Sequence, residues 1–196
     1  MRFVWFVLAV SLVVRPARAD DQGPLATTRA VLERSHAIVV AEGDRNHKLE
    51  QLKGLLRSFL DTDTLGRSAM GKHLDGHSSG EVKAFLDLFR ELFLRTYVQR
   101  LLLFDAPEFA FGKETIDGGT ATVATEIVTE HDRFAVDYRL AKAAGGWRAT
   151  DILVEEVSLG GNFRSQFDAA LATDSFAELL DRLRRKVAGK PNVAGF

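Results

Sequence analysis

Apolar residues recur at helical spacing in the first part of the chain. They repeat every three or four positions over Leu25–Ala41 and again over His47–Leu60, which predicts two amphipathic helices. Asp61 then offers a side chain that can cap a short third helix, which we predict to end near Met70. A loop is predicted from Gly71 to His77.

The longest helix is predicted from Ser78 or Ser79 to about Phe104. Serine is a favourable N-cap, and Glu81 lies in the first turn, where a carboxylate suits the helix dipole. Its two adjoining apolar stripes consist of Phe85, Leu88, Phe89 and Leu92 and of Val82, Leu86, Phe93 and Tyr97. Together they are wider than the usual apolar arc of somewhat over about 100°. We therefore expect this helix to be buried on more than one side, by protein or partly by an apolar ligand.

Four β-strands are predicted after Pro107. They span Glu108–Glu114, Thr120–Thr129, Arg133–Ala141 and Trp147–Val154, and turn-forming residues separate them. Short links between successive strands require antiparallel neighbours. The alternation of apolar and polar residues gives the sheet one apolar face and one polar face.

Two helices are predicted to follow the sheet, from about Asn162 to Ala172 and from about Ser175 to Val187, with Asp174 as a possible N-cap of the second. Helices before and after an antiparallel sheet with one apolar face predict an α+β domain, in which helices pack on one side of the sheet.

Residues 1–19 have the pattern of a cleaved Sec-type signal peptide. Arg2 precedes the apolar run Phe3–Val14, and Ala17-Arg18-Ala19 places small residues before the predicted cleavage point. The run is shorter than the roughly 20 residues of a transmembrane helix, and Arg15-Pro16 closes it. We therefore expect the protein to be exported to the periplasm.

Removal of the signal peptide leaves residues 20–188 as one ordinary domain and residues 189–196 as a flexible tail. It takes away three of the 26 basic residues and none of the 27 acidic ones, which leaves a formal charge of −4. This charge argues against a nucleic-acid partner, which would favour a basic face. The sequence contains no cysteine, so it has no disulfide, thiol nucleophile or lipid-anchored cysteine.

No catalytic residue, metal site or organic cofactor is predicted. His73 and His77 lie four positions apart, but glycines bracket them in a predicted loop, which argues against a zinc site. The serines occupy no Gly-x-Ser-x-Gly elbow, and the Gly160-Gly161 pair lacks the pattern of a phosphate-binding loop.

The segment Gly145–Phe167 is predicted to run from a strand directly into a helix. It contains, in order, Trp147, Asp151, Glu155, Val157-Ser158, Asn162, Arg164 and Phe167. At this spacing the residues resemble the MlaC-like, or toluene-tolerance, family of periplasmic lipid carriers, which shuttle phospholipids for an ABC transporter.

Two earlier segments extend the resemblance, so that it covers about Leu25 to Val187. The first, similar to a Phe-Asp…Leu-Gly-Arg segment of the family, contains Phe59, Asp61, Thr64-Leu65, Ala69-Met70-Gly71 and Lys72. The second, similar to the family's long helix, contains Phe85, Phe89, Leu92, Thr96-Tyr97 and Leu101. The chain departs from the family at His73-Leu74, where an aromatic residue is expected, and in its short loop after Phe104, so the rim of the cavity is expected to differ.

The resemblance implies an NTF2-like fold, with a curved antiparallel sheet of about four strands packed against several helices and an apolar cavity between them. Acyl chains would be buried there, because each methylene exposed to water costs roughly 0.8 kcal/mol. Ordinary core packing is an equal alternative for each residue of the predicted lipid-binding wall. That wall consists of Phe89, Phe93, Tyr97, Leu101, Phe109, Phe111, Val123, Ile127, Phe134, Val136, Tyr138, Ile152 and Val154.

The resemblance also implies the partners of the protein. They are a phospholipid, an inner-membrane ABC transporter with an MCE-domain subunit, and an outer-membrane lipoprotein complex, with the carrier itself a monomer. A hopanoid-associated carrier and a lipid-free adaptor of the transporter are alternatives within this scheme. Arg164 is a candidate for a lipid phosphate, with a salt bridge or a helix-surface contact as its alternative role.

An enzymatic alternative also stays open, because small NTF2-like folds house isomerases and dehydratases that place a carboxylate or histidine in an apolar pocket. Asp137, Asp151 and His131 are the residues to test. Asp137 alternates with apolar residues, which predicts that it faces solvent, and Asp151 also fits a structural carboxylate near a strand end. An acid–base pair needs partners within hydrogen-bond reach that the sequence does not supply.

Overall fold

The computed structural model describes residues 22–103 and 107–189. The predicted signal peptide, and the predicted tail beyond Gly189, lie outside these residues. The helices are α1 (Pro24–Val40), α2 (Arg45–Phe59), α3 (Thr62–Met70), the 3₁₀ turn η2 (Gly71–Leu74), α4 (Ser79–Leu101), α5 (Leu159–Leu171) and α6 (Phe176–Ala188). The strands are β1 (Glu108–Asp117), β2 (Thr120–Val128), β3 (Arg133–Ala143), β4 (Gly146–Val154) and β5 (Val157–Ser158).

Side-chain caps mark where α3, α4, α5 and α6 begin. Asp61 accepts a hydrogen bond from the backbone N–H of Thr64 at the start of α3, as predicted, and Ser78 forms a capping box at the start of α4. The cap of α6 is Ser175 and not the predicted Asp174. Ser158 caps α5, which therefore begins at Leu159, earlier than predicted. In each case a side-chain oxygen, of aspartate in α3 and of serine in the other three helices, satisfies one of the unpaired N–H groups of the first turn.

The sheet has one strand more than the predicted four. Its strands follow chain order, β1-β2-β3-β4-β5, and every neighbouring pair is antiparallel. The additional strand β5 has two residues and pairs with the end of β4 through a tight turn at Glu155 and Glu156, which both have positive φ angles. A pair of this length carries no detectable alternation, so the pattern of apolar residues did not reveal it.

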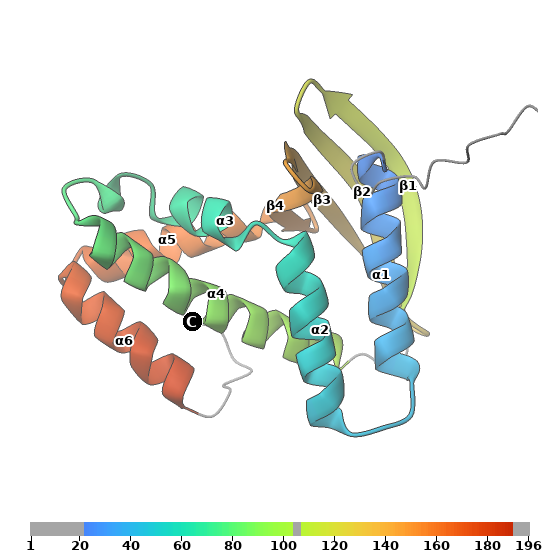
Figure 1. Ribbon diagram of the computed structural model, residues 1–196, viewed down its shortest axis with the longest axis horizontal. Coiled ribbons are helices and arrows are strands. Elements are labelled where there is room, and N and C mark those ends of the chain that lie inside the picture. Colours follow the sequence, from blue (N-terminus) through green and yellow to red (C-terminus); the bar gives the residue numbers. More distant parts are fainter. Residues whose placement is uncertain (1–21, 104–106, 190–196) are drawn as a thin grey trace, which may run out of the picture.

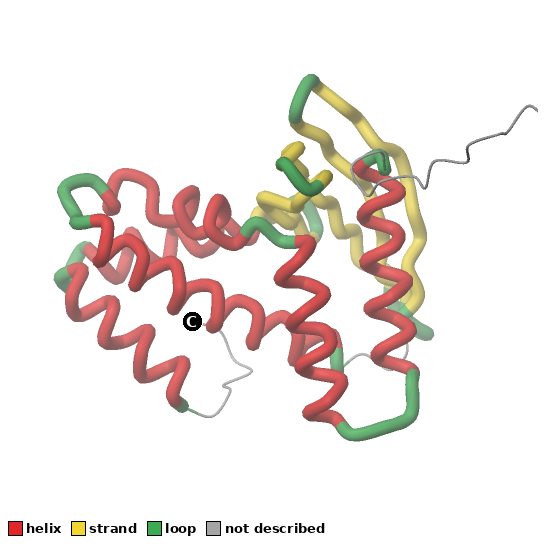
Figure 2. Tube along the Cα trace, viewed as in Figure 1, coloured by secondary structure: helices red, strands yellow, loops and turns green. Residues whose placement is uncertain are grey.

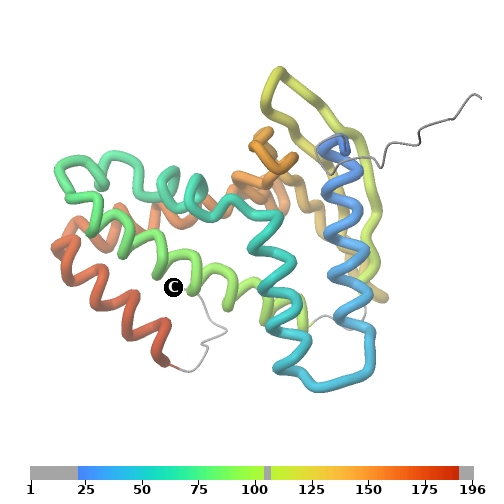
Figure 3. Tube along the Cα trace, in the orientation of Figure 1, coloured from blue at the N-terminus to red at the C-terminus, as the bar shows by residue number. Residues whose placement is uncertain are grey.

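The sheet lies at one end of the molecule and α3, α4, α5 and α6 at the other (Figure 2). Helix α1 lies across β1 and β2, and α2 contacts α1, α4 and β4, so it joins the two ends (Figure 1). The first and last helices lie far apart: α1 packs on the sheet, whereas α6 lies beside α4 (Figure 3). Among the described residues, no helix combines the length and apolar character needed to cross a bilayer.

Contacts between aromatic rings hold the group of helices together. Phe89 of α4 lies 5.2 Å from Phe163 of α5 and 5.8 Å from Phe85, measured between ring centroids. Phe85 in turn contacts Phe167 of α5 and Phe176 of α6. The prediction that the longest helix is buried on more than one side is thus confirmed, because α4 packs on α2, α3 and α6.

Candidate functional site

The sheet residues of the predicted wall lie in three cross-strand rows of the apolar face. Directly paired residues of antiparallel strands place their side chains on the same face. The first row is Phe109, Ile127 and Phe134; the second is Phe111, Thr125, Val136 and Val154; the third is Val123, Tyr138 and Ile152. Every sheet residue of the predicted wall therefore lies on this one face.

On β2 and β3 the first row is less buried than the other two rows. Val123 is fully buried and Tyr138 is 7% exposed, so the third row forms part of the core at β2 and β3. Phe109, Ile127 and Phe134 are all half-buried. Apolar surface therefore stays partly accessible at the end of the sheet beside the β2–β3 turn.

Helices α1 and α2 cover much of the second and third rows. The guanidinium of Arg29 on α1 lies 3.9 Å from the centre of the Phe111 ring. His36, farther along α1, shares a hydrogen bond of 2.8 Å with the carbonyl of Pro107, just before β1. The ring of Phe59, the last residue of α2, lies 5.7 Å from that of Tyr138. Side chains of α1 and α2 thus cover the second and third rows where they contact the sheet.

Helix α4 shows the same change of exposure along its length. Phe89 and Phe93 are buried at 0% and 1% exposure, Tyr97 and Leu101 are half-buried, and Leu103 just beyond the helix is 61% exposed. Burial raises the pKa of the Tyr97 hydroxyl, an effect that the nearby Arg100 cation partly opposes. The end of α4 therefore presents apolar surface that the helices do not bury.

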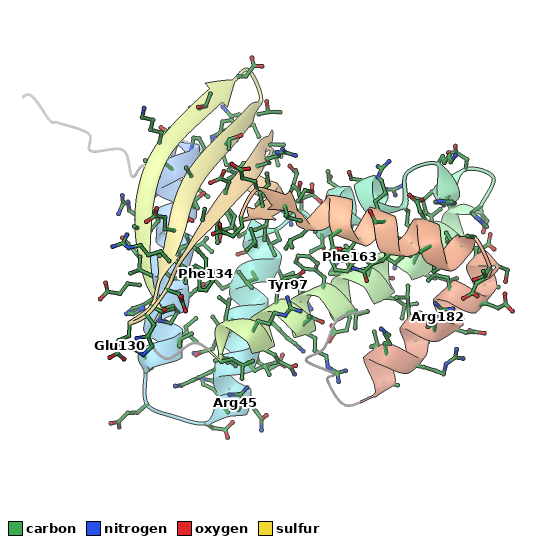
Figure 4. All side chains as sticks on the ribbon, turned by 180° about the vertical axis from the view of Figure 1, so that it is seen from behind. Arg45, Tyr97, Glu130, Phe134, Phe163 and Arg182 are labelled. Carbon is green, nitrogen blue, oxygen red and sulfur yellow. The ribbon has the colours of Figure 1, made fainter. Side chains whose placement is uncertain are left out.

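A short stretch of chain links the end of α4 to the first strand of the sheet. Pro107 follows Leu103 by four positions, so the two residues lie within about 14 Å of each other. Figure 4 shows Phe134 and Tyr97 in the region between the sheet and α4, and Phe163 deeper among the helices. We call these partly exposed residues the open apolar site: Tyr97, Leu101, Phe109, Ile127 and Phe134.

The predicted wall thus divides into three groups. Phe89 and Phe93 pack among the aromatic rings of the helices, and Val123, Val136 and Tyr138 are core residues of the sheet. Phe111 and Ile152 are half-buried, and Val154 is 36% exposed at the edge of its row. The open apolar site holds the remaining five. The prediction did not include Leu102, which packs half-buried against the core; the apolar run at the end of the helix was its only sequence signal.

The three residues considered for acid–base chemistry, Asp137, Asp151 and His131, lie outside the open apolar site. The Asp151 carboxylate accepts hydrogen bonds from the Ile152 N–H at 2.9 Å, the Ser158 hydroxyl at 2.6 Å and the Gly160 N–H at 3.1 Å. It therefore joins β4 to the start of α5, the structural role offered as its alternative. Asp137, paired with Leu153, lies on the opposite face from the three apolar rows. His131 lies in the exposed β2–β3 turn.

The two histidines of the Gly71–His77 segment also make structural contacts. His73 Nε2 lies 2.6 Å from an Asp168 carboxylate oxygen on α5, and the His77 ring stacks on Phe176 of α6 with centroids 3.9 Å apart. Within the part of the chain that the structure describes, no three His, Asp or Glu side chains are grouped as metal ligands would be. Both imidazoles thus connect this segment to α5 and α6.

Arg164 has the helix-surface role that was the alternative to phosphate binding. Its guanidinium donates a hydrogen bond to the Ser68 carbonyl of α3. It lies directly against Gly71, where a Cβ atom would come within 3.2 Å of it and where φ is +50°. The spacing of Gly71 and Arg164 in the sequence therefore reflects a packing contact between α3 and α5.

Comparison with known proteins agrees with this architecture. The phospholipid-binding protein from Ralstonia solanacearum, solved in complex with a phospholipid, matches with a TM-score of 0.74 and 21% sequence identity over 88% of this chain and 98% of the other. This similarity shows a shared α+β fold. A comparison with curated proteins found no significant match. The family model described as MlaC protein matches residues 27–185, so the chain belongs to the MlaC family.

Proposed function

We propose that the protein is a periplasmic lipid carrier that binds phospholipid acyl chains between its sheet and the end of α4. The observation that carries this proposal is the open apolar site, in which aromatic and aliphatic side chains from the end of α4 and from the sheet stay partly uncovered. Singly exposed apolar residues are common, but adjoining ones on facing elements mark an interaction site. An apolar cavity between the rows and α4 would hold the chains.

The free energy of desolvation gives such a site its function. Each methylene removed from water contributes roughly 0.8 kcal/mol, so burial of about ten methylenes would stabilise the bound lipid by roughly 8 kcal/mol. Phe134, Ile127 and Tyr97 supply this burial without any reacting group. The Ralstonia protein supports the proposal, since its structure has the same fold and contains a phospholipid.

The family suggests where the carrier acts. We infer that the N-terminal signal peptide directs it to the periplasm. There it would exchange lipid with an inner-membrane ABC transporter bearing an MCE-domain subunit and with an outer-membrane lipoprotein complex, as a monomer. Membership of the MlaC family supports these partners.

Native mass spectrometry with lipid extraction tests the proposal. The mature protein, purified from the periplasm without detergent, is expected to carry stoichiometric phospholipid. Phe134→Ser should lower the bound fraction severalfold, because it places a hydroxyl on the apolar face. Ala135→Ser is the matched control: its exposed side chain points to the other face of the same strand.

The other outcomes separate the alternatives. A bound hopanoid would identify the hopanoid-associated carrier. A wild-type protein that is purified without lipid and takes none from vesicles would refute the carrier and favour the lipid-free adaptor. Equal lipid loading of the Phe134→Ser and Ala135→Ser variants would place the lipid away from the open apolar site.

A further inference from the structure

Arg100 borders the open apolar site, and no carboxylate of the described residues forms an ion pair with it. The Arg100 guanidinium lies 5.3 Å from the centre of the Tyr97 ring, a member of that site. Among the described residues, Arg100 forms no ion pair, and its side chain is exposed. A guanidinium held over an aromatic ring keeps its donor groups free at the ring edge.

Three other arginines that pack on the helices or on the sheet are already engaged. Arg95, one turn earlier on α4, donates hydrogen bonds to the carbonyls of Val187 and Gly189 at the end of α6. Arg29, which covers Phe111, lies 3.6 Å from the Glu33 carboxylate. Arg164 is bound to α3. Unlike these three, the Arg100 side chain is paired with no carboxylate or carbonyl of the described residues, so it can meet an anion.

We infer that Arg100 binds the phosphodiester of the cargo lipid, an inference that rests on the proposed carrier function. In a glycerophospholipid the phosphate lies next to the glycerol from which both acyl chains extend. Chains inserted between the first row and α4 would leave the phosphate at the rim, on the side of Tyr97 and Arg100. The forked guanidinium can donate two parallel hydrogen bonds to phosphate oxygens.

The position of Arg100 in the last turn of α4 offers a competing explanation. A cation there stabilises the helix dipole with no ligand at all. Arg67 provides a matched control, because it is also an exposed arginine in the last turn of a helix, α3, and is not part of the open apolar site. The two arginines differ in their distance from the site and not in their relation to a helix end.

A comparison of lipids with and without a phosphate distinguishes phosphate binding by Arg100 from a contribution of Arg100 to helix stability. The full mature protein is equilibrated with vesicles that contain phosphatidylglycerol or diacylglycerol with the same acyl chains, and the bound fraction is measured by native mass spectrometry. Arg100→Gln is expected to weaken phosphatidylglycerol binding about five- to tenfold, the loss of one partly exposed charge-assisted contact. Diacylglycerol binding should change less than about twofold. Arg100→Lys, which keeps the charge but not the fork, should lie between.

Three results would overturn the inference. Arg100→Gln could bind phosphatidylglycerol as wild type does, it could lose both lipids equally, or Arg67→Gln could produce the same selective loss. Calorimetry with inorganic phosphate alone distinguishes the source of the anion: heat that depends on Arg100 would assign the site to free phosphate. A wild-type protein that binds neither lipid would instead refute the proposed carrier function.

Discussion

Gly66 lies where α3 crosses α4 and has no room for a side chain. A Cβ atom at this position would come within 2.9 Å of the Phe89 ring and 3.0 Å of the Leu86 side chain. Phe89 cannot rotate away easily, because it is fully buried and contacts the rings of Phe85 and Phe163. We therefore expect Gly66→Ala to overpack the core.

Two opposing contributions set the size of this effect. Alanine favours a helix over glycine by about 1 kcal/mol. Overpacking a well-filled core costs about 1–3 kcal/mol, and the contact here is with a buried ring. The net expectation is a loss of about 1 kcal/mol in the free energy of unfolding, or about 3 °C in Tm for a domain of this size.

Gly54 is the matched control for the helix contribution. It lies within α2, it is exposed, and nothing comes within 4 Å of a Cβ atom built there. Gly54→Ala should therefore raise the free energy of unfolding by about 0.5–1 kcal/mol, measured by urea titration.

The comparison of the two variants also tests the role of Phe89. If Phe89 lined an open lipid cavity, its ring could move into that space and the clash would vanish. Gly66→Ala would then be as stable as Gly54→Ala, and the assignment of Phe89 to the packed core would be refuted.

Three further substitutions test other contacts. Asp151→Asn should lower the free energy of unfolding by about 2–3 kcal/mol, because a carboxylate that holds β4 to α5 is lost; urea titration of a variant as stable as wild type would contradict this role. Glu156→Gly should stabilise the protein by about 0.5–1 kcal/mol, since Glu156 has a φ of 66° that glycine adopts without strain; a lower Tm would argue against strain in the turn. Burial raises the pKa of Tyr138 above its usual value of 10.0, so the stability it contributes is present below pH 10 and is lost as the pH rises further. Tyr138→Phe should therefore lose less stability than the wild type above pH 10. Plots of Tm against pH that run parallel for the two proteins from about pH 9 to 11.5 would refute this expectation.

Much of the local structure was predictable because its causes lie close together in the sequence. Helical periodicity and the Asp61 and Ser78 caps placed α3 and α4 within a few residues of their observed bounds. Strand alternation and short turns likewise predicted an antiparallel meander with one apolar face. Asp174 and Ser175 are both good caps, and only the helix geometry selects Ser175.

The sequence predicted which face of the sheet is apolar, but it did not predict which part of that face stays exposed. Alternation placed Val123 and Ile127 on the same face, yet the first is fully buried and the second half-buried. The difference arises from long-range contacts such as Arg29 with Phe111 and Phe59 with Tyr138. The sequence pattern contains no information about which rows a distant helix will cover.

The sequence by itself determined the α+β class, the apolar face, the long helix and the resemblance to the MlaC family, since these depend on residue type and spacing. The tertiary structure alone decided that Phe89 and Phe93 join the aromatic core, that Phe134 and Tyr97 stay partly open, and that Arg164 serves packing. The physical reason is that burial is a property of pairs of surfaces: an apolar stripe favours leaving water, but only the fold decides which surface covers it.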